Sequence, residues 1–139
     1  MKRAVQLRRL SSDHHRALVM AKKARRIAQD DTAQAATLWQ ELEHYYVSEL
    51  DEHFRIEESH LGKQLAAVGR HDLLHWLQQE HAKLRTFFQA DNSRSVAQLH
   101  ALGELLAQHV RFEERELFNV AQELLGDEHL QALLQEYGE

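Results

Sequence analysis

The sequence predicts an all-helical protein, an up-down antiparallel four-helix bundle followed by a short C-terminal helix, in a single domain over residues 1–139. Length supports one domain, because 139 residues are enough for one hydrophobic core and too few for two. Composition supports helix, because Leu, Ala, Gln and Glu dominate while Val, Ile and Thr are scarce and Pro is absent. Short polar or glycine-containing breaks leave four long amphipathic segments, which pack best as an antiparallel bundle.

The first two helices occupy roughly the N-terminal half of the chain. The first is expected to be capped at Ser11 or Ser12 and to run to about Gln29, after an N-terminal arm. The second is expected over about 32–67, because its apolar residues recur on one face at helical spacing. The polar residues Asp30, Asp31 and Thr32 mark the break between the two helices.

The remaining helices follow breaks that contain Gly, Asp, Asn or Ser. The third is expected over about 72–90. The fourth is expected to begin at Ser95, because Gln98 three residues later completes a capping box. A short last helix over about 127–137 is expected to cap the bundle or to pair with another copy.

The chain contains no cysteine and 11 histidines. The absence of cysteine excludes disulfides, thiolate metal sites, iron–sulfur clusters and cysteine nucleophiles. Metal binding or acid–base chemistry must therefore use His, Glu and Asp, and the many histidines are the first feature to explain.

Charge argues against nucleic acid as a partner, because the formal net charge is -5. Nine of the 17 basic residues lie in the first 26 positions, and they are interpreted as a solvated helix face. No apolar run approaches the ~18 residues that a membrane span needs, and the N-terminus lacks the apolar centre of a secretory signal. We therefore expect a soluble, cytoplasmic protein that does not bind membranes.

The sharpest feature is a nine-residue pattern, HxRxEExxL, that occurs twice with an offset of 56 residues. Each copy places a His four positions before a Glu, as His53 with Glu57 and His109 with Glu113. Residues four apart lie on one helix face, so both side chains can reach one ion or two adjacent ions. The two glutamates also interrupt apolar faces, where an unpaired carboxylate is costly, so each needs a cation or a donor network.

The first and third helices carry a fainter echo of this pattern, Asp13 before His14 and Glu80 before His81. With this extension the bundle core receives one histidine from each helix and one carboxylate from each copy of the pattern. His14 continues the apolar stripe of its helix, whereas the adjacent His15 points about 100° away and is kept as the alternative ligand.

At these residues the chain resembles the hemerythrin-like, or HHE cation-binding, domain family, whose members are four-helix bundles that hold two non-haem irons. The resemblance covers nearly the whole chain. It implies two iron ions in an Fe-O-Fe or Fe-OH-Fe type centre, with manganese or zinc as possible substitutes. The implied ligands are His14 and His53 on one iron, His81 and His109 on the other, and Glu57 and Glu113 as bridges. Imidazole and carboxylate without thiolate agree with iron or manganese.

The chain departs from oxygen-carrying hemerythrins at two positions. Those proteins have a second histidine one turn before the one on the third helix, where this chain has Leu77, and they end with an aspartate five residues after its histidine, where Glu113 follows His109 at four. The implied ligand set is therefore symmetric and leaves both metals open to a small ligand. Glu49 is expected either to orient His53 as a hydrogen-bond acceptor or to serve as a ligand itself.

The leading hypothesis is a di-iron protein that binds or reacts with dioxygen or a related small ligand, in oxygen, redox or iron sensing or handling. An oxidase or peroxidase is the alternative within the same site. A ferritin-like oxidase is disfavoured, because the two Glu-x-x-His pairs, Glu41 with His44 and Glu57 with His60, fall on one helix. A metal-free interaction module, with its basic first helix on an acidic partner, is the alternative from another class.

Overall fold

The structure, a computed structural model, describes residues 3–133, and within that range every regular element is helical. The helices are α1 (Arg8–Arg26), α2 (Thr32–Tyr45), α3 (Asp51–Ile56), α4 (Lys63–Ala67), α5 (His71–Thr86), α6 (Val96–Phe112), α7 (Phe118–Leu124) and α8 (Asp127–Leu133). A 3-10 turn, Val5–Leu7, precedes α1. In residues 3–133 no helix is both long enough and apolar enough to cross a membrane.

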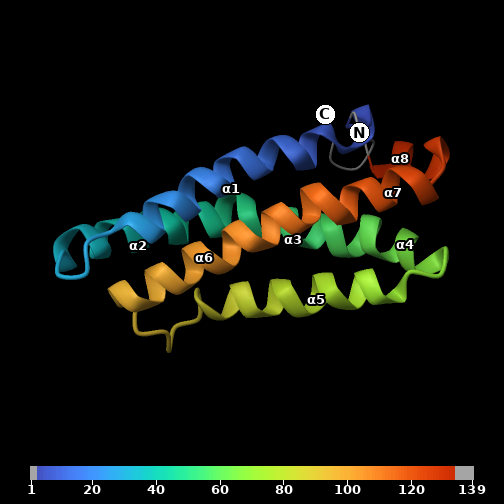
Figure 1. Cartoon of the computed structure of the whole chain (residues 1–139). Coiled ribbons are helices and arrows are strands. Elements are labelled where there is room, and N and C mark those ends of the chain that lie inside the picture. The colour runs from blue at the N-terminus through green and yellow to red at the C-terminus, as the bar shows by residue number, and fades with distance from the viewer. Residues whose placement is uncertain (1–2, 134–139) are drawn as a thin grey trace.

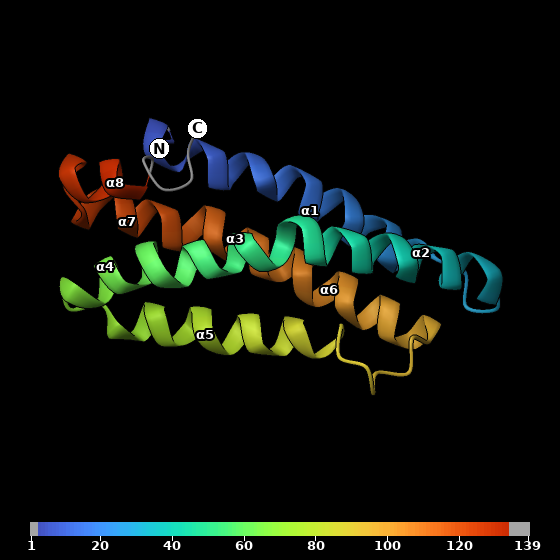
Figure 2. The same cartoon turned by 180° about the vertical axis from the view of Figure 1, so that it is seen from behind.

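Three π-helical turns join neighbouring helices into longer rods. The turns Tyr46–Leu50 and Glu57–Gly62 connect α2, α3 and α4, and the turn Glu113–Leu117 connects α6 to α7. The long helical segments are therefore α1, α2 to α4, α5, and α6 to α7, and they run alongside one another in both views (Figures 1 and 2). Helix α1 contacts α6, α4 contacts α5, and α8 contacts the turn before α1.

The helix boundaries correct several expectations. Helix α1 begins at Arg8 rather than at a serine cap, and it ends at Arg26, before the expected Gln29. Helix α5 ends at Thr86 and not near residue 90. From Phe87 the chain continues in turns. The last expected helix begins at Asp127 as predicted, but residues 134–137 lie outside the described range.

The Ser95 cap is present, although its partner differs from the expected box. The Ser95 hydroxyl accepts a hydrogen bond from the backbone N–H of Gln98 at 3.1 Å. The Gln98 side chain instead accepts from Asn92 at 2.9 Å, which ties the preceding loop to the helix. The cap satisfies one of the open N–H groups at the start of α6.

Two apolar clusters fill the interior, one on each side of a buried polar layer. The first cluster contains Met20, Trp39, Leu84 and Leu106, and the second contains Leu10, Leu61, Leu77 and Leu117. Each helix that contributes to the polar layer passes from one cluster to the other. On α5, for example, His81 lies between Leu77 and Leu84 and is 0% exposed. The packing of both clusters therefore holds the polar residues in place from two sides.

Close contact between α1 and α6 depends on Gly103. A Cβ at this position would meet the carbonyl oxygen of Ala21 at 2.6 Å and the backbone nitrogen of Arg25 at 3.0 Å. These are backbone atoms, which cannot rotate away as a side chain does. A glycine is also required at the turn between α4 and α5, where Gly69 has a φ of 93°.

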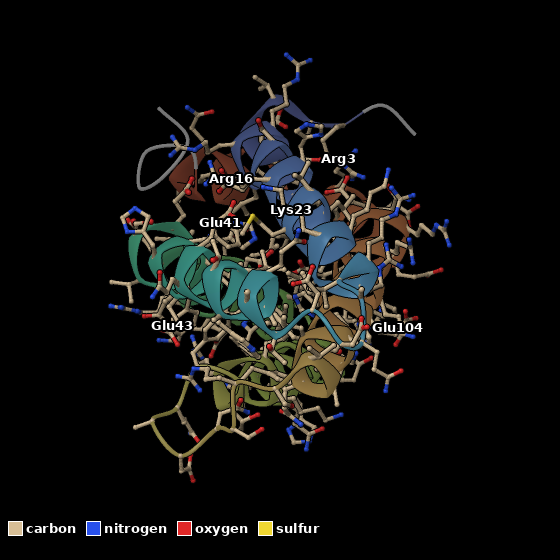
Figure 3. All side chains as sticks on the ribbon, turned by 90° about the vertical axis from the view of Figure 1, so that its left-hand side faces the viewer. Arg3, Arg16, Lys23, Glu41, Glu43 and Glu104 are labelled. Carbon is tan, nitrogen blue, oxygen red and sulfur yellow. The ribbon has the colours of Figure 1, made fainter. Side chains whose placement is uncertain are left out.

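Arg16 and Lys23 of α1 lie on the outside of the protein, as the view along the helices shows (Figure 3). Several basic residues near the N-terminus meet acidic partners from other elements. Lys23 pairs with Glu41 at 2.9 Å, Arg25 with Glu104 at 3.8 Å, and Arg3 with Glu114 at 3.3 Å. The interpretation of these residues as a solvated face is compatible with this arrangement.

Candidate metal centre

The buried polar layer consists of four histidines and two glutamates, one histidine from each long segment. Its members are His14, His53, Glu57, His81, His109 and Glu113, and each is at most 3% exposed. Both glutamates are the first residues of π-helical turns, and each lies one turn beyond the histidine of its own pattern. Such turns are rare and occur frequently at functional sites.

The first donor group consists of His14, His53, Glu57 and Glu113. The Nε2 atom of His14 lies 2.9 Å from Oε1 of Glu113, and the Nε2 atom of His53 lies 3.1 Å from Oε2 of Glu57. The two Nε2 atoms are 3.2 Å apart, so both imidazoles direct the same nitrogen to one point.

The second donor group consists of His81, His109, Glu57 and Glu113. The Nε2 atom of His81 lies 3.2 Å from Oε1 of Glu57, and the Nε2 atom of His109 lies 3.2 Å from Oε1 of Glu113. Within each group the donor atoms all lie within 4.8 Å of one another, so each can hold a metal ion. Glu57 and Glu113 belong to both groups.

Several of these donor atoms are buried without a hydrogen bond. Within residues 3–133 the orphaned atoms include all four carboxylate oxygens of Glu57 and Glu113 and the Nε2 atoms of His81 and His109. Buried carboxylate and imidazole groups are ordinarily hydrogen-bonded, because an unsatisfied polar group is costly in an apolar interior. A cation in each group would satisfy these atoms together, and the residues present therefore fit a pair of metal ions.

Neighbouring glutamates raise the pKa of two histidines of the layer, His53 and His109. Burial by itself would lower the pKa of His53, but the charge of Glu57 and a hydrogen bond to Asp13 raise it to about 9. Burial is likewise overcome at His109, where Glu113 raises the pKa to about 9. Burial would raise the pKa of Glu57, but the neighbouring histidines hold it well below its usual range. Without metal, protons on His53 and His109 therefore offset part of the negative charge of the buried carboxylates.

The Nδ1 atom of each histidine faces a second carboxylate outside the donor groups. The acceptors and distances are Glu114 for His14 at 2.6 Å, Asp13 for His53 at 3.0 Å, Glu58 for His81 at 2.8 Å and Glu80 for His109 at 3.9 Å. An ionised carboxylate can only accept, so a hydrogen-bonded Nδ1 is the donor. The Nε2 atom is then the nitrogen left for a metal.

Three aromatic rings stack on histidines of the centre. Phe54 stacks on His81 with ring centroids 4.1 Å apart, and Phe118 stacks on His14 at 5.3 Å. Trp76 stacks on His109 at 5.1 Å. The rings restrict how each imidazole can turn, and they exclude water from its face.

A small cavity of about 20 Å³ adjoins the centre on the side of His14 and His53. Tyr45, Leu106 and Val110 are among the residues that line it. Arg16 and Glu49 also line it, and their side chains are 53% and 52% exposed, so the cavity extends toward the surface. A volume of this size admits about one water-sized or diatomic molecule.

The alternative residues lie away from the donor atoms. His15 is exposed, so helix α1 directs His14 inward instead. Glu49 faces Arg16 at 3.8 Å, and the hydrogen-bond acceptor of His53 is Asp13 instead. In the described residues, neither metal-holding group includes His44 or His60, which a ferritin-like site would require.

Four acidic residues around the centre, Asp13, Glu58, Glu80 and Glu114, were not among the expected ligands, although Asp13 and Glu80 were noted as an echo of the repeated pattern. A signal for them was present, because each stands directly beside a predicted ligand in the sequence. Glu58 and Glu114 also repeat as the second glutamate of the duplicated pattern. Their targets lie on other helices, and one sequence does not show which histidine each one meets.

Comparison of the chain with protein-family models, with curated proteins and with solved structures finds no match. The function of the buried layer must therefore be inferred from the geometry and chemistry of its residues. Those residues provide two adjacent nitrogen and oxygen donor groups that share two carboxylates.

Proposed function

We propose that the chain is an up-down four-helix bundle of the hemerythrin-like type that holds two iron ions and binds or reacts with dioxygen or a related small ligand. One observation carries this proposal. Glu57 and Glu113 are buried, and both belong to each of the two histidine-containing donor groups. Carboxylates shared in this way suit two cations held side by side, whereas a single ion has no need of them.

The donor set supports iron over most other metals. Each group offers two imidazole nitrogens and carboxylate oxygens, and the chain has no cysteine. These ligands suit iron, manganese or zinc, whereas calcium and magnesium prefer oxygen alone. Bound iron would supply redox chemistry and open positions for a small molecule.

The protein residues perform the remaining tasks in this proposal. Glu57 and Glu113 hold the two ions together and balance part of their charge. The four histidines complete the donor groups from four different segments, so metal binding also fastens the segments to one another. The stacked ring of Phe118 keeps water from His14, and the cavity beside Tyr45 gives a small ligand its route.

The cavity supports a small ligand rather than an organic substrate. Its volume of about 20 Å³ is far below that of pockets for drug-sized molecules, which measure roughly 300–1,000 Å³. The cavity borders both histidines of the first donor group, and of the second group's histidines it borders His109. We therefore assign the entry of the small ligand to this side of the centre.

The experiment is metal analysis of protein produced with abundant iron, followed by absorption spectra of the reduced protein before and after exposure to air. We expect about two irons per chain and a new charge-transfer band on exposure to air. His53→Ala should lower the iron content, whereas His60→Ala, which changes a histidine outside both groups, should not. Iron-free protein whose stability is unchanged by His53→Ala would refute the proposal. Turnover of added peroxide would identify the chain as an enzyme.

A further inference from the structure

Four acidic residues face the Nδ1 atoms of the four histidines. Each one faces the histidine of a neighbouring segment, so the contacts run once around the centre. Asp13 precedes His14 on α1 but faces His53 on α3. Glu58 follows Glu57 in the rod of α3 but faces His81 on α5. Each segment therefore supplies an acceptor to the histidine of the next segment rather than to its own.

The contacts of the other two acidic residues complete this circuit around the centre. Glu80 precedes His81 on α5 and faces His109 on α6. Glu114 follows Glu113 after α6 and returns to His14 on α1 at 2.6 Å. The four carboxylates thus form a ring of cross-helix contacts, which we call the carboxylate ring (Asp13, Glu58, Glu80 and Glu114).

Each member of the carboxylate ring also meets a cation on its outer side. The pairs are Asp13 with Arg9 at 3.5 Å, Glu58 with Arg85 at 3.1 Å, Glu80 with Lys83 at 3.3 Å and Glu114 with Arg3 at 3.3 Å. A cation on one side and an imidazole on the other fix the position of a carboxylate more firmly than either contact alone. Chance contacts would not repeat this arrangement four times.

We infer that the carboxylate ring consists of positioning residues, which hold the four Nε2 atoms toward the two proposed metal positions. This inference depends on the proposed function for its metal, but the ring itself is a property of the protein alone. Asp13 and Glu114 serve the histidines of the first donor group, and Glu58 and Glu80 serve those of the second.

The carboxylate ring also holds the histidines of the two proposed metal positions with unequal firmness. Three of its links are hydrogen bonds between 2.6 and 3.0 Å long, whereas Glu80 stands 3.9 Å from His109. Within the described chain, Nδ1 of His109 has no hydrogen-bond partner. His109 is therefore the least constrained of the four histidines. We expect the first position to fill before the second.

The ring itself can be tested on metal-free protein by NMR of the imidazole nitrogens. An Nδ1–H that donates to a carboxylate has a downfield, slowly exchanging proton signal. Glu58→Ala should remove this signal for His81 alone, and Glu58→Gln should restore part of it, because the amide oxygen still accepts. Asp51→Ala is the matched control, since Asp51 also binds Arg85, at 3.2 Å, without contacting His81. An unchanged His81 signal in Glu58→Ala would overturn the ring.

The role of the carboxylate ring in metal binding can be tested by titration with Zn²⁺ in competition with a chelating dye. This measurement does not depend on any activity of the protein. Loss of a carboxylate that orients a metal-binding histidine typically lowers metal affinity by about 10–100-fold. We expect that loss for the second Zn²⁺ in Glu58→Ala and for the first in Glu114→Ala, with little change in Asp51→Ala. Equal losses in Glu58→Ala and Asp51→Ala would overturn the positioning role. Wild-type protein that binds no metal would refute the proposed function, while the NMR result would still decide the ring.

Discussion

Oε1 of Glu57 lies 3.2 Å from Nε2 of His81, while Oε2 of the same carboxylate lies 3.1 Å from Nε2 of His53. One glutamate thus reaches histidines of both donor groups through different oxygens. Glu113 also reaches both groups, since its Oε1 lies 2.9 Å from His14 and 3.2 Å from His109. The two positions are therefore joined through glutamates, and this relationship leads to the first prediction.

Replacing Glu57 by Ala should remove both ions, whereas His53→Ala should remove mainly one. The reason is that Glu57 belongs to both donor groups and His53 to the first alone. Metal analysis of both variants after loading with iron measures the difference. A Glu57→Ala protein that keeps one full equivalent would show that the glutamate serves a single position. Circular dichroism of each variant establishes that the helices remain folded.

The stability of the metal-free protein should fall as pH rises from 6.5 to about 9. The pKa values of His53 and His109 are raised from 6.5 to about 9 in the folded chain, so the folded state binds more protons than the unfolded state in this window. Their stabilising contribution is complete below pH 6.5 and is lost as pH rises through the folded value. Between these two pH values, each imidazole lowers the free energy of unfolding by about 1.4 kcal/mol per pH unit. Urea unfolding at several pH values measures this slope.

Bound metal should reverse this dependence on pH. An ion must displace the protons on the imidazole nitrogens, so its stabilising effect grows as those protons become easier to remove. The gain in midpoint of thermal unfolding on adding Zn²⁺ should therefore be larger at pH 8 than at pH 6.5. An equal gain at both values would place the metal elsewhere than at these histidines.

Much of the centre was predictable because it depends on helical spacing and on an internal repeat. The duplicated pattern identified His53, Glu57, His109 and Glu113 as inward-facing, and the structure buries all four. The choice of His14 over His15 followed from helical phase, and His14 is the buried one. A residue's inward direction is a local property, which one sequence reveals.

The contacts between helices were not predictable in the same way. Glu49 was expected to orient His53 because it lies one turn away, but Asp13 from another helix occupies that place. The π-helical turns that begin at Glu57 and Glu113 were also missed, because a regular spacing of 3.6 residues does not show an inserted residue. Phe54, Trp76 and Phe118 were not expected to stack on the histidines, since this depends on how the helices are packed.

Gly103→Ala should destabilise the fold by about 1–3 kcal/mol, because the added methyl group meets backbone atoms of α1 and the helices must separate. Gly126→Ala is the control, since nothing lies within 4 Å of the corresponding Cβ. Chemical denaturation of both variants gives the comparison. Equal stability in the two variants would show that α1 and α6 are not in such close contact.

Ala17→Val should hinder entry of the small ligand without removing the metal. Ala17 lines the cavity and is 2% exposed, and two added methyl groups take up much of a space of about 20 Å³. We expect the usual iron content and slower development of the absorption band after mixing the reduced protein with air-saturated buffer. Stopped-flow absorption measures the rate. An unchanged rate would mean that the small ligand enters by another route.

The central claim is that two ions share the carboxylates of Glu57 and Glu113, and anomalous X-ray diffraction at the iron edge tests it most directly. Crystals of the iron-loaded protein should show two peaks between the long helical segments. One should lie beside His14 and His53, the other beside His81 and His109, with both glutamates in contact with each peak. A single peak, or no peak where these six side chains meet, would contradict the account.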